Sequence, residues 1–355
     1  MPDLLTLLKD LRQANTSDVH ITPDTPVFVR KNGFLEPLKD CRFSEADIKK
    51  IILGTSTPKA REILGKSRQV NYAFLCDGVP YRFAAFFDKG RFALTIRIIP
   101  AVPPKFADLG LPDTLKKALS KNSGLIIVSS PSGQGKTTTI ASILDFINTH
   151  FEKNIITVEN PVEIRFKDDK SSFIQRSIPL DVPNFYEGLS EAYRLDPDIV
   201  VSDSLNYRDA MDQALFLCEA GCLVIGATDG GTCQQVLERI IYSRPAEERD
   251  SLRGKLATHL NVLISQKLAP RSDHPGQVGI FDILVNTPQV KSLIRNENLV
   301  MLKTIQEQDS ASSMQTFDRH LMNLVRKNVI SAATAVALAD DSFEMAARFS
   351  TKGRA

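Results

Sequence analysis

The segment from residue 130 to residue 138 combines glycines, small side chains, one lysine and threonine hydroxyl groups in a spacing that suits phosphate binding. Gly133 and Gly135 permit backbone angles that turn successive N–H groups inward, and a helix that begins here adds its positive end. Lys136 can reach the β- and γ-phosphates of a nucleotide, and the Thr137 hydroxyl can ligate magnesium. We therefore predict that ATP and Mg²⁺ are bound by Ser130, Pro131, Ser132, Gly133, Gln134, Gly135, Lys136, Thr137 and Thr138.

One position departs from the G-x-x-x-x-G-K-[ST] pattern of such loops, because Ser130 stands where the first glycine is expected. A small residue still allows the turn, so we expect phosphate binding to survive. The alternative is a glycine-rich turn that joins a strand to a helix and binds nothing. The apolar run LIIVSS before the loop and the helical stretch after it favour phosphate binding.

A buried sheet is predicted to hold this loop. LIIVSS, NIITVE, DIVVSD and CLVIGA are short β-branched runs that alternate with helical stretches. Near-continuous apolar strands separated by helices are typical of a parallel sheet that is buried on both faces. The predicted fold class of residues 113–281 is therefore α/β, and residues 282–355 are predicted to be helical.

The chain before the loop follows another pattern. Its first leucines lie on one stripe at helical spacing, and residues 27–100 hold short β-rich runs around a helical stretch near residues 45–54. This pattern predicts a smaller α+β domain over residues 1–100. Prolines gather in the next stretch and break regular elements, so residues 101–112 are predicted to be an interdomain linker.

The whole chain has 355 residues, 43% of them hydrophobic and 24% charged, which is ordinary for a globular protein of two domains. Its 44 basic and 42 acidic side chains nearly cancel, so we expect no nucleic-acid partner. No apolar run approaches the ~20 residues that a membrane span needs, and the start of the chain lacks a secretory signal pattern. We expect a cytoplasmic protein without an integral membrane segment.

The five cysteines are odd in number and contain no C-x-x-C pair. Cys218, Cys222 and Cys233 come nearest to a metal-binding pattern, but the first two fall in an apolar stretch. We therefore expect reduced structural thiols and neither disulfides nor a zinc site.

Several motifs, in their order along the chain, resemble those of one family, the type IV pilus retraction ATPases of the PilT type within the secretion ATPase superfamily. The resemblance covers nearly the whole chain. It begins with SDVHI at residues 17–21 and passes through the phosphate loop. The further matching motifs are TVENPVE at 157–163, LDPDIVV at 195–201, PAEE at 245–248, ISQKL at 264–268, ILVNTP at 283–288, LIR at 293–295 and MQTFD at 314–318.

The resemblance implies a homohexameric ring of two-domain subunits, in which a PAS-like domain precedes a RecA-like P-loop motor domain and ATP lies between subunits. It also implies that ATP hydrolysis turns a platform protein of the inner membrane and so drives pilus retraction and twitching motility. Such a protein would be cytoplasmic and peripheral at the inner-membrane base of the pilus. Extension and type II secretion relatives usually carry a C-x-x-C zinc insertion, and its absence here favours the retraction branch.

The carboxylates that the resemblance assigns to hydrolysis are altered in this chain. The acidic box, normally Glu-Asp-Pro-x-Glu, reads Glu-Asn-Pro-Val-Glu from Glu159 to Glu163. A second segment, normally Gly-Glu-Met-Arg-Asp, reads Ser-Asp-Ser-Leu-Asn and puts Asp203 in the place of the catalytic glutamate. The expected catalytic carboxylates are therefore Glu159, Glu163 and Asp203. Asp203 is shorter by one methylene, and a misplacement of ~1 Å can cost ~100-fold in rate.

Both histidines of the family's histidine box are missing. Cys222 and Asp229 stand in their places. A carboxylate at position 229 would repel a γ-phosphate unless magnesium or another cation lies between them. These two changes argue against ordinary turnover.

Two arginines of the first domain match positions that, in the family, reach the nucleotide of a neighbouring subunit. They are Arg82 and Arg97, and a guanidinium fork suits phosphate geometry. An arginine on a β-strand is otherwise often only a solvated side chain. The resemblance favours a catalytic role for both.

The sequence leaves two functions from different classes open. The first is a hexameric motor that hydrolyses ATP to retract a pilus. The second is a nucleotide-binding accessory protein that hydrolyses ATP weakly and assembles with, or regulates, an active paralogue, and the altered catalytic positions favour it. A RecA-like motor that acts on DNA is a weaker third alternative, because no basic, aromatic-rich stretch is present.

Overall fold

The computed structural model describes residues 3–14, 16–31, 34–99, 102–309 and 311–350. The chain forms two compact units. The first contains Met1–Val102, Val158–Lys167 and Gln175–Gly188, and the second contains Pro103–Thr157, Asp168–Ile174 and Leu189–Ala355. Segments 158–167 and 175–188, which the sequence placed in the ATPase domain, therefore group with the first unit.

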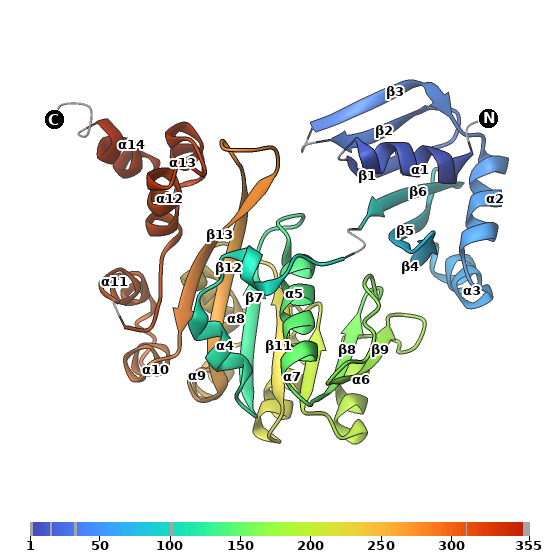
Figure 1. Cartoon of the computed structure of the whole chain (residues 1–355). Coiled ribbons are helices and arrows are strands. Elements are labelled where there is room, and N and C mark those ends of the chain that lie inside the picture. Colours follow the sequence, from blue (N-terminus) through green and yellow to red (C-terminus); the bar gives the residue numbers. More distant parts are fainter. Residues whose placement is uncertain (1–2, 15, 32–33, 100–101, 310, 351–355) are drawn as a thin grey trace. The chain divides into compact units, whose positions relative to one another are not determined.

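The first unit is built on an antiparallel sheet of six strands in the order β3-β2-β1-β6-β5-β4 (Figure 1). The strands are β1 (Thr16–Ile21), β2 (Pro26–Lys31), β3 (Phe34–Arg42), β4 (Gln69–Cys76), β5 (Val79–Asp88) and β6 (Arg91–Ile98). The helices are α1 (Leu4–Gln13), α2 (Glu45–Thr55) and α3 (Pro58–Ser67). The predicted amphipathic start of the chain and the helical stretch near residues 45–54 are confirmed as α1 and α2.

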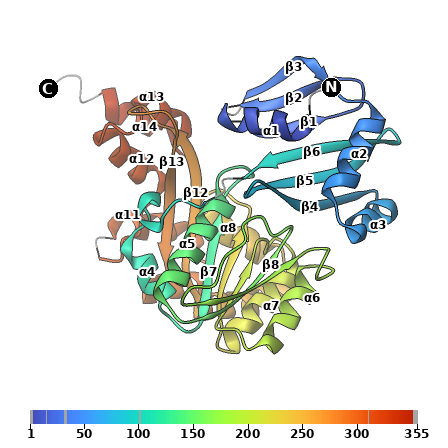
Figure 2. The ribbon, with the colours of Figure 1, turned by 45° about the vertical axis from the view of Figure 1, so that its right-hand side comes forward.

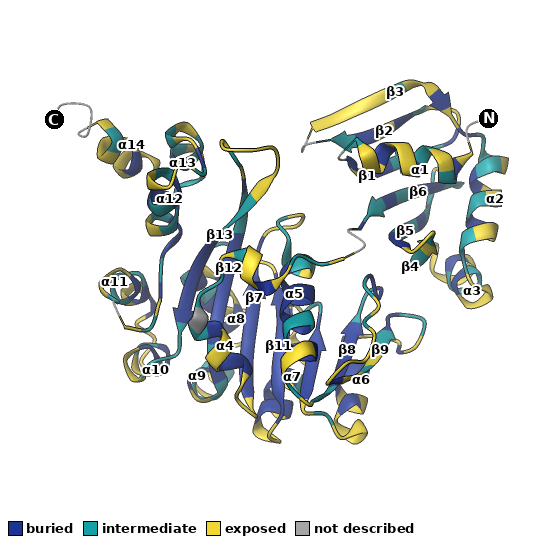
Figure 3. Ribbon diagram, viewed as in Figure 1, coloured by how far each residue is buried: buried dark blue, intermediate teal, exposed yellow. Residues whose placement is uncertain are grey.

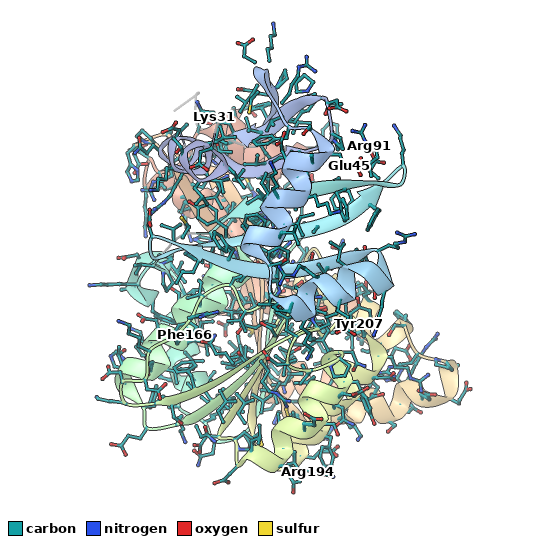
Figure 4. The ribbon with its side chains drawn as sticks, turned by 90° about the vertical axis from the view of Figure 1, so that its right-hand side faces the viewer. Lys31, Glu45, Arg91, Phe166, Arg194 and Tyr207 are labelled. Carbon is teal, nitrogen blue, oxygen red and sulfur yellow. The ribbon has the colours of Figure 1, made fainter. Side chains whose placement is uncertain are left out.

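Hydrogen bonds and ion pairs start helix α2 and fix it on the sheet of this unit. The Ser44 side chain accepts from the Asp47 backbone N–H and the Asp47 carboxylate accepts from the Ser44 backbone, which is a capping box that starts α2. Arg91 of β6 donates to Glu45 at 3.3 Å and to Asp24 at 2.6 Å, and Figure 4 shows Arg91 and Glu45 close together. These contacts tie the first turn of α2 to the sheet beneath it.

The second unit is built on a sheet of seven strands in the order β13-β12-β7-β11-β10-β8-β9. The strands are β7 (Gly124–Ser129), β8 (Asn154–Glu159), β9 (Ser172–Ser177), β10 (Ile199–Ser202), β11 (Leu223–Thr228), β12 (Leu260–Pro270) and β13 (Gln277–Val285). β12, β7, β11 and β10 pair in parallel, whereas β13 is antiparallel to β12. Every residue of β7, β10 and β11 is buried, which explains their continuous apolar sequences (Figure 3).

Helices cover both faces of the central strands. In Figures 1 and 2, α5 lies over one face of β7 and β11. α7 packs on the same two strands from the other face, next to α9, and α8 packs on β12 and β13. The helices of this part of the chain are α4 (Asp113–Leu119), α5 (Lys136–His150), α6 (Phe185–Ala192), α7 (Arg208–Glu219), α8 (Cys233–Tyr242) and α9 (Ala246–His259). The predicted α/β class with buried parallel strands is confirmed.

The stretch predicted to be a linker is partly structured. It contains the short 3-10 helix η1 (Phe106–Leu109). Phe106 is buried, and its ring centroid lies 4.8 Å from that of Phe146 in α5, with the two rings tilted. Residue 101 of the predicted linker lies outside the described residues. From Pro103 onward, the predicted linker belongs to the segment Pro103–Thr157 of the second unit.

The end of the described chain is helical, as predicted, but it begins later than residue 282. β13 continues to Val285 because its backbone pairs with β12 up to that residue. The helices that follow are α10 (Pro288–Arg295), α11 (Leu302–Gln308), α12 (Phe317–Arg326), α13 (Ala332–Leu338) and α14 (Ser342–Ser350). Phe317 and Leu321 of α12 are fully buried in a cluster with Ile280 of β13, which anchors these helices on the outer strand.

Two predicted features concern the chain as a whole. Among the described residues, no helix is long and apolar enough to cross a bilayer. All five cysteines are free thiols, and every one except Cys76 is buried. No group of three or more potential metal ligands from His, Cys, Asp and Glu occurs in the part of the chain that the structure describes.

Candidate nucleotide site

The predicted phosphate loop joins the buried end of β7 to the first turn of α5. Gly133 and Gly135 both have left-handed backbone angles, with φ of 77° and 87°. Residues 131–133 are exposed, whereas Ser130 is fully buried at the base of the loop. The small residue at position 130 is therefore required by space, and serine fills it with a hydroxyl that donates to the Pro131 carbonyl at 2.8 Å.

The start of α5 presents unpaired backbone donors to the loop. Its N-cap is Gly135, and no described side chain caps it. The first bond within the helix runs from the Thr139 N–H to the Gly135 carbonyl at 3.0 Å, which leaves the N–H groups of residues 136–138 without helical partners. Such N–H groups, together with the helix dipole, attract an anion.

Gln266 of β12 fixes the loop in place, although the sequence analysis gave it no role. Its side-chain amide donates to the Gln134 carbonyl and accepts from the Thr139 hydroxyl at 2.7 Å. In return, the Gln134 side chain accepts from the Leu268 backbone N–H at 2.7 Å. A Cβ atom at Gly135 would lie only 2.7 Å from the Gln266 amide nitrogen, so the loop has no room for a side chain there.

Lys136 is held inside the loop by three oxygen acceptors, of which the Pro131 carbonyl is the most distant at 3.4 Å. Its ammonium donates to the Ser130 carbonyl at 2.6 Å and to the Asp229 carboxylate at 2.8 Å. The Lys136 side chain is only 17% exposed, whereas that of Asp229 is 60% exposed. The sequence analysis required a cation between Asp229 and a γ-phosphate, and in the structure the lysine of the phosphate loop is that partner.

Asp229 is also bound from the side of the loop after β10. Asn206 donates to its carboxylate at 2.8 Å and accepts from its backbone N–H at 2.9 Å. The same Asn206 oxygen accepts from the Thr228 hydroxyl at 2.9 Å and from Arg239 of α8 at 3.2 Å. Asn206 and Asp229, which both depart from the family pattern, are thus neighbours in one hydrogen-bonded network. Arg239 is a member that the sequence analysis missed.

Asp203 directly follows β10, so it lies at the carboxyl edge of the sheet, as the phosphate loop does. The Leu205 side chain beside it is buried, and a Cβ atom at Gly226 of β11 would collide with it. The loss of the family's arginine at position 205 is therefore a packing change. Cys222, in contrast, precedes β11 and lies at the opposite edge of the sheet from the phosphate loop.

The other predicted catalytic residues belong to the first unit. Glu159 ends β8 and accepts from the Gln175 side chain at 3.2 Å. Arg82 of β5 donates to Glu163 at 2.9 Å, and Glu163 is buried. Two predicted catalytic residues, Arg82 and Glu163, therefore form an ion pair with each other.

Arg97 also has an acidic partner in its own subunit. It donates to the buried Asp18 carboxylate at 2.8 Å, and the two residues lie opposite each other in the pairing of β6 with β1. Asp18 belongs to the SDVHI motif with which the resemblance begins. Both arginines are therefore positioned by carboxylates and are not loosely solvated.

A phosphate loop at the carboxyl edge of a buried parallel sheet, followed by a helix that begins with free N–H groups, defines the second unit as a P-loop nucleotide-binding domain. The family model described as "Type II/IV secretion system protein" matches residues 4–336 of the chain. The chain belongs to this family.

Relatives with known names cover nearly the whole chain. It is 28% identical over 340 residues to the type IV pilus ATPase PilU of Pseudomonas aeruginosa, with 96% of this chain and 89% of PilU covered. It is 28% identical over 334 residues to the pilus retraction ATPase PilT of the same bacterium, with 94% of this chain and 97% of PilT covered. The predicted resemblance to the PilT-type ATPases is confirmed.

A solved structure of the pilus retraction motor PilT with bound ADP is similar in fold, with a TM-score of 0.83 and 30% sequence identity. The match covers 97% of this chain and 99% of that one. The predicted architecture, a RecA-like P-loop domain preceded by a smaller α+β domain of the PAS-like kind, is confirmed by this similarity.

Proposed function

We propose that this chain is an ATP-hydrolysing motor subunit that drives retraction of a type IV pilus. The observation that carries the proposal is the uncapped start of α5 behind a loop that holds Lys136 at the edge of a buried parallel sheet. The similarity to PilU and PilT over more than nine-tenths of the chain supports the pilus as the object of the motor.

The triphosphate would bind against the backbone N–H groups of residues 133–138, and Lys136 would contact its β- and γ-phosphates. The exposed Thr137 side chain lies in the first turn of α5, and its hydroxyl would ligate magnesium. Bound magnesium would offset the charge that develops on the phosphates during hydrolysis. The remaining residues of the segment Ser130–Thr138 would shape the loop.

Hydrolysis would proceed by in-line attack of water on the γ-phosphate. Asp203 or Glu159 would orient that water, and Glu163 would act through the acidic box. Arg82 and Arg97 of a neighbouring subunit would stabilise the charge that develops. Because these arginines contact Glu163 and Asp18 within their own subunit, a role across subunits requires that they exchange these partners for phosphate oxygens.

The proposed working unit is a homohexamer at the cytoplasmic base of the pilus. It would turn a platform protein of the inner membrane and bind no nucleic acid. The near balance of 44 basic and 42 acidic side chains supports the absence of a nucleic-acid partner.

A second candidate function is that of a weakly hydrolytic accessory subunit that assembles with an active pilus ATPase. Two observations favour it. Asp203 is shorter than the expected glutamate, and the Lys136 ammonium is already bound to the Asp229 carboxylate at 2.8 Å. Both would slow turnover without preventing assembly.

Phosphate release by the purified oligomer separates the two functions. For a motor that acts alone, we expect turnover of about 1 s⁻¹ or more that Lys136→Ala abolishes, because the lysine neutralises the phosphates. Asp203→Glu is expected to raise the rate of a weak enzyme by restoring the longer carboxylate. ATP binding without turnover that depends on Lys136 would contradict the independent motor, and fast turnover would contradict the accessory role.

A further inference from the structure

The contact between Lys136 and Asp229 joins the phosphate loop to the end of the neighbouring strand β11. β7 and β11 pair in parallel up to Ser129 and Thr228, so the residues that follow them emerge side by side. The Lys136 ammonium and the Asp229 carboxylate are 2.8 Å apart. Lys136 donates its remaining contacts to backbone carbonyls of the loop, so Asp229 supplies the negative charge among its acceptors.

Asp229 is held in this position by more than the lysine. One carboxylate oxygen accepts from Lys136 and the other from the Asn206 amide, each at 2.8 Å. Asn206 is itself fixed by the Thr228 hydroxyl and by Arg239. A side chain that is 60% exposed would not adopt one geometry without such partners, so the network positions the carboxylate on the lysine.

The Asp229 carboxylate contacts the ammonium group that a nucleotide phosphate would contact. A phosphate loop binds nucleotide partly because its lysine contacts the β- and γ-phosphates. A carboxylate 2.8 Å from that lysine neutralises it and adds a negative charge beside the phosphate path. A nucleotide must therefore displace Asp229 from Lys136, and the displaced carboxylate keeps Asn206 as a partner.

We propose that Asp229 is an internal competitor of the nucleotide phosphates for Lys136 and thereby sets the affinity of this site for ATP. The inference rests on the proposed function, since it takes the phosphate loop to be the nucleotide site. It assigns Asp229 a positioning role in the free state, in which it holds the lysine and excludes other anions.

Calorimetric titration of the full chain with ATP tests this inference, once in EDTA and once with excess magnesium. The variant is Asp229→Asn, which keeps the size of the side chain and removes its charge. The matched control is Asp198→Asn. Asp198 pairs with Lys153 at 3.4 Å, and it precedes β10 at the opposite edge of the sheet.

Asp229→Asn is expected to bind ATP about two- to fivefold more tightly than the native chain in both buffers, because an ion pair no longer has to be broken. Asp198→Asn is expected to bind as the native chain does. Unchanged or weaker binding by Asp229→Asn would overturn the inference. Weaker binding only with magnesium would show instead that Asp229 serves the metal.

A second background separates this inference from the proposed function. Adding Asp229→Asn to Lys136→Ala should give a much smaller gain than it gives in the native chain, because the competition acts through the lysine. An equal gain in both backgrounds would overturn the competitor role. If the native chain binds ATP through Lys136 but Asp229→Asn changes nothing, only this inference falls. If neither the native chain nor any variant binds ATP, the proposed function falls with it.

Discussion

At the scale of single residues, the phosphate loop depends on the absence of a side chain at Gly135. A Cβ atom there would meet the Gln266 amide at 2.7 Å, in a left-handed conformation with φ of 87°. Gly133 has a similar conformation, with φ of 77°, but open space around it. A side chain at Gly133 would therefore cause backbone strain alone, whereas one at Gly135 would also collide with Gln266.

We predict that Gly135→Ala weakens ATP binding far more than Gly133→Ala. Gly133→Ala adds only backbone strain of about 1 kcal/mol, which lowers the affinity about fivefold. Gly135→Ala adds the same strain and also displaces Gln266 from the loop. Fluorescence titration with a labelled ATP analogue measures both. Equal losses of ATP affinity for the two variants would contradict the claim that Gln266 of β12 fixes the loop.

The residues of the site differ in how far sequence could predict them. Ser130 to Thr138 are contiguous, so their spacing alone predicted the loop. The contact of Lys136 with Asp229 joins residues 93 positions apart, and the bond from Gln266 to Gln134 joins residues 132 positions apart. Such pairs depend on which strands are neighbours, and a single sequence does not state that.

At the scale of elements, the buried Asp282 and the partly buried His320 hold β13 and the helices around it. Burial raises the pKa of Asp282 to about 6, and its carboxylate accepts from the Cys233 N–H at the start of α8 at 2.8 Å. Burial lowers the pKa of His320 in α12 to about 4, and its ring accepts from the Phe281 N–H at 2.9 Å. The two groups have opposite effects on stability.

The stabilisation from Asp282 is present below about pH 4 and is lost as pH rises through about 6, because the unfolded carboxyl ionises first. The stabilisation from neutral His320 is present above about pH 6.5 and is lost as pH falls through about 4. Between about pH 4 and pH 6.5, the contribution of Asp282 to the free energy of unfolding therefore falls with pH, and that of His320 rises.

We predict that removing either group reveals how the other changes the free energy of unfolding with pH. Between pH 4 and pH 6.5, the free energy of unfolding of Asp282→Asn should rise with pH, and that of His320→Asn should fall, each by roughly 2 to 3 kcal/mol. Urea denaturation across this range measures both variants. Slopes of the same sign would show that at least one of these groups does not titrate as its burial requires.

The elements themselves were predicted where the sequence pattern is strong. β7, β8, β10 and β11 lie in the apolar runs that predicted them. In the first unit, β1, β3 and β4 were not predicted as strands. Most side chains of β3 are exposed at the edge of the sheet, so FLEPLKDCR has little apolar alternation. The helical region was predicted to begin too early because the last residues of β13, FDILV, are almost entirely buried and lack a period of two.

At the scale of the whole molecule, the proposed hexamer shares each site between two subunits, and mixed rings test this arrangement. Subunits with Lys136→Ala and subunits with Arg97→Gln should each be inactive alone. Together they should recover part of the activity, because the lysine of one subunit then meets Arg97 of its neighbour. Phosphate release after co-assembly measures the recovery.

The matched control is a mixture of Lys136→Ala with Asp203→Ala subunits. Lys136 and Asp203 both belong to the second unit, so each site takes both residues from the same chain. Every site in this mixture therefore lacks either the lysine or the carboxylate. This mixture should stay inactive. Recovery of phosphate release in both mixtures, or in neither, would contradict the proposal that Arg97 acts at the site of a neighbouring subunit. Glutamine at position 97 can still hydrogen-bond Asp18, so thermal unfolding should change little.

The most direct test of the nucleotide site is a structure of this chain with magnesium and a non-hydrolysable ATP analogue. We predict that the β- and γ-phosphates lie against the N–H groups at the start of α5, with Thr137 at the metal. The Lys136 ammonium should contact the phosphates and should no longer lie 2.8 Å from Asp229. A nucleotide bound elsewhere, or bound while Lys136 stays on Asp229, would contradict the account.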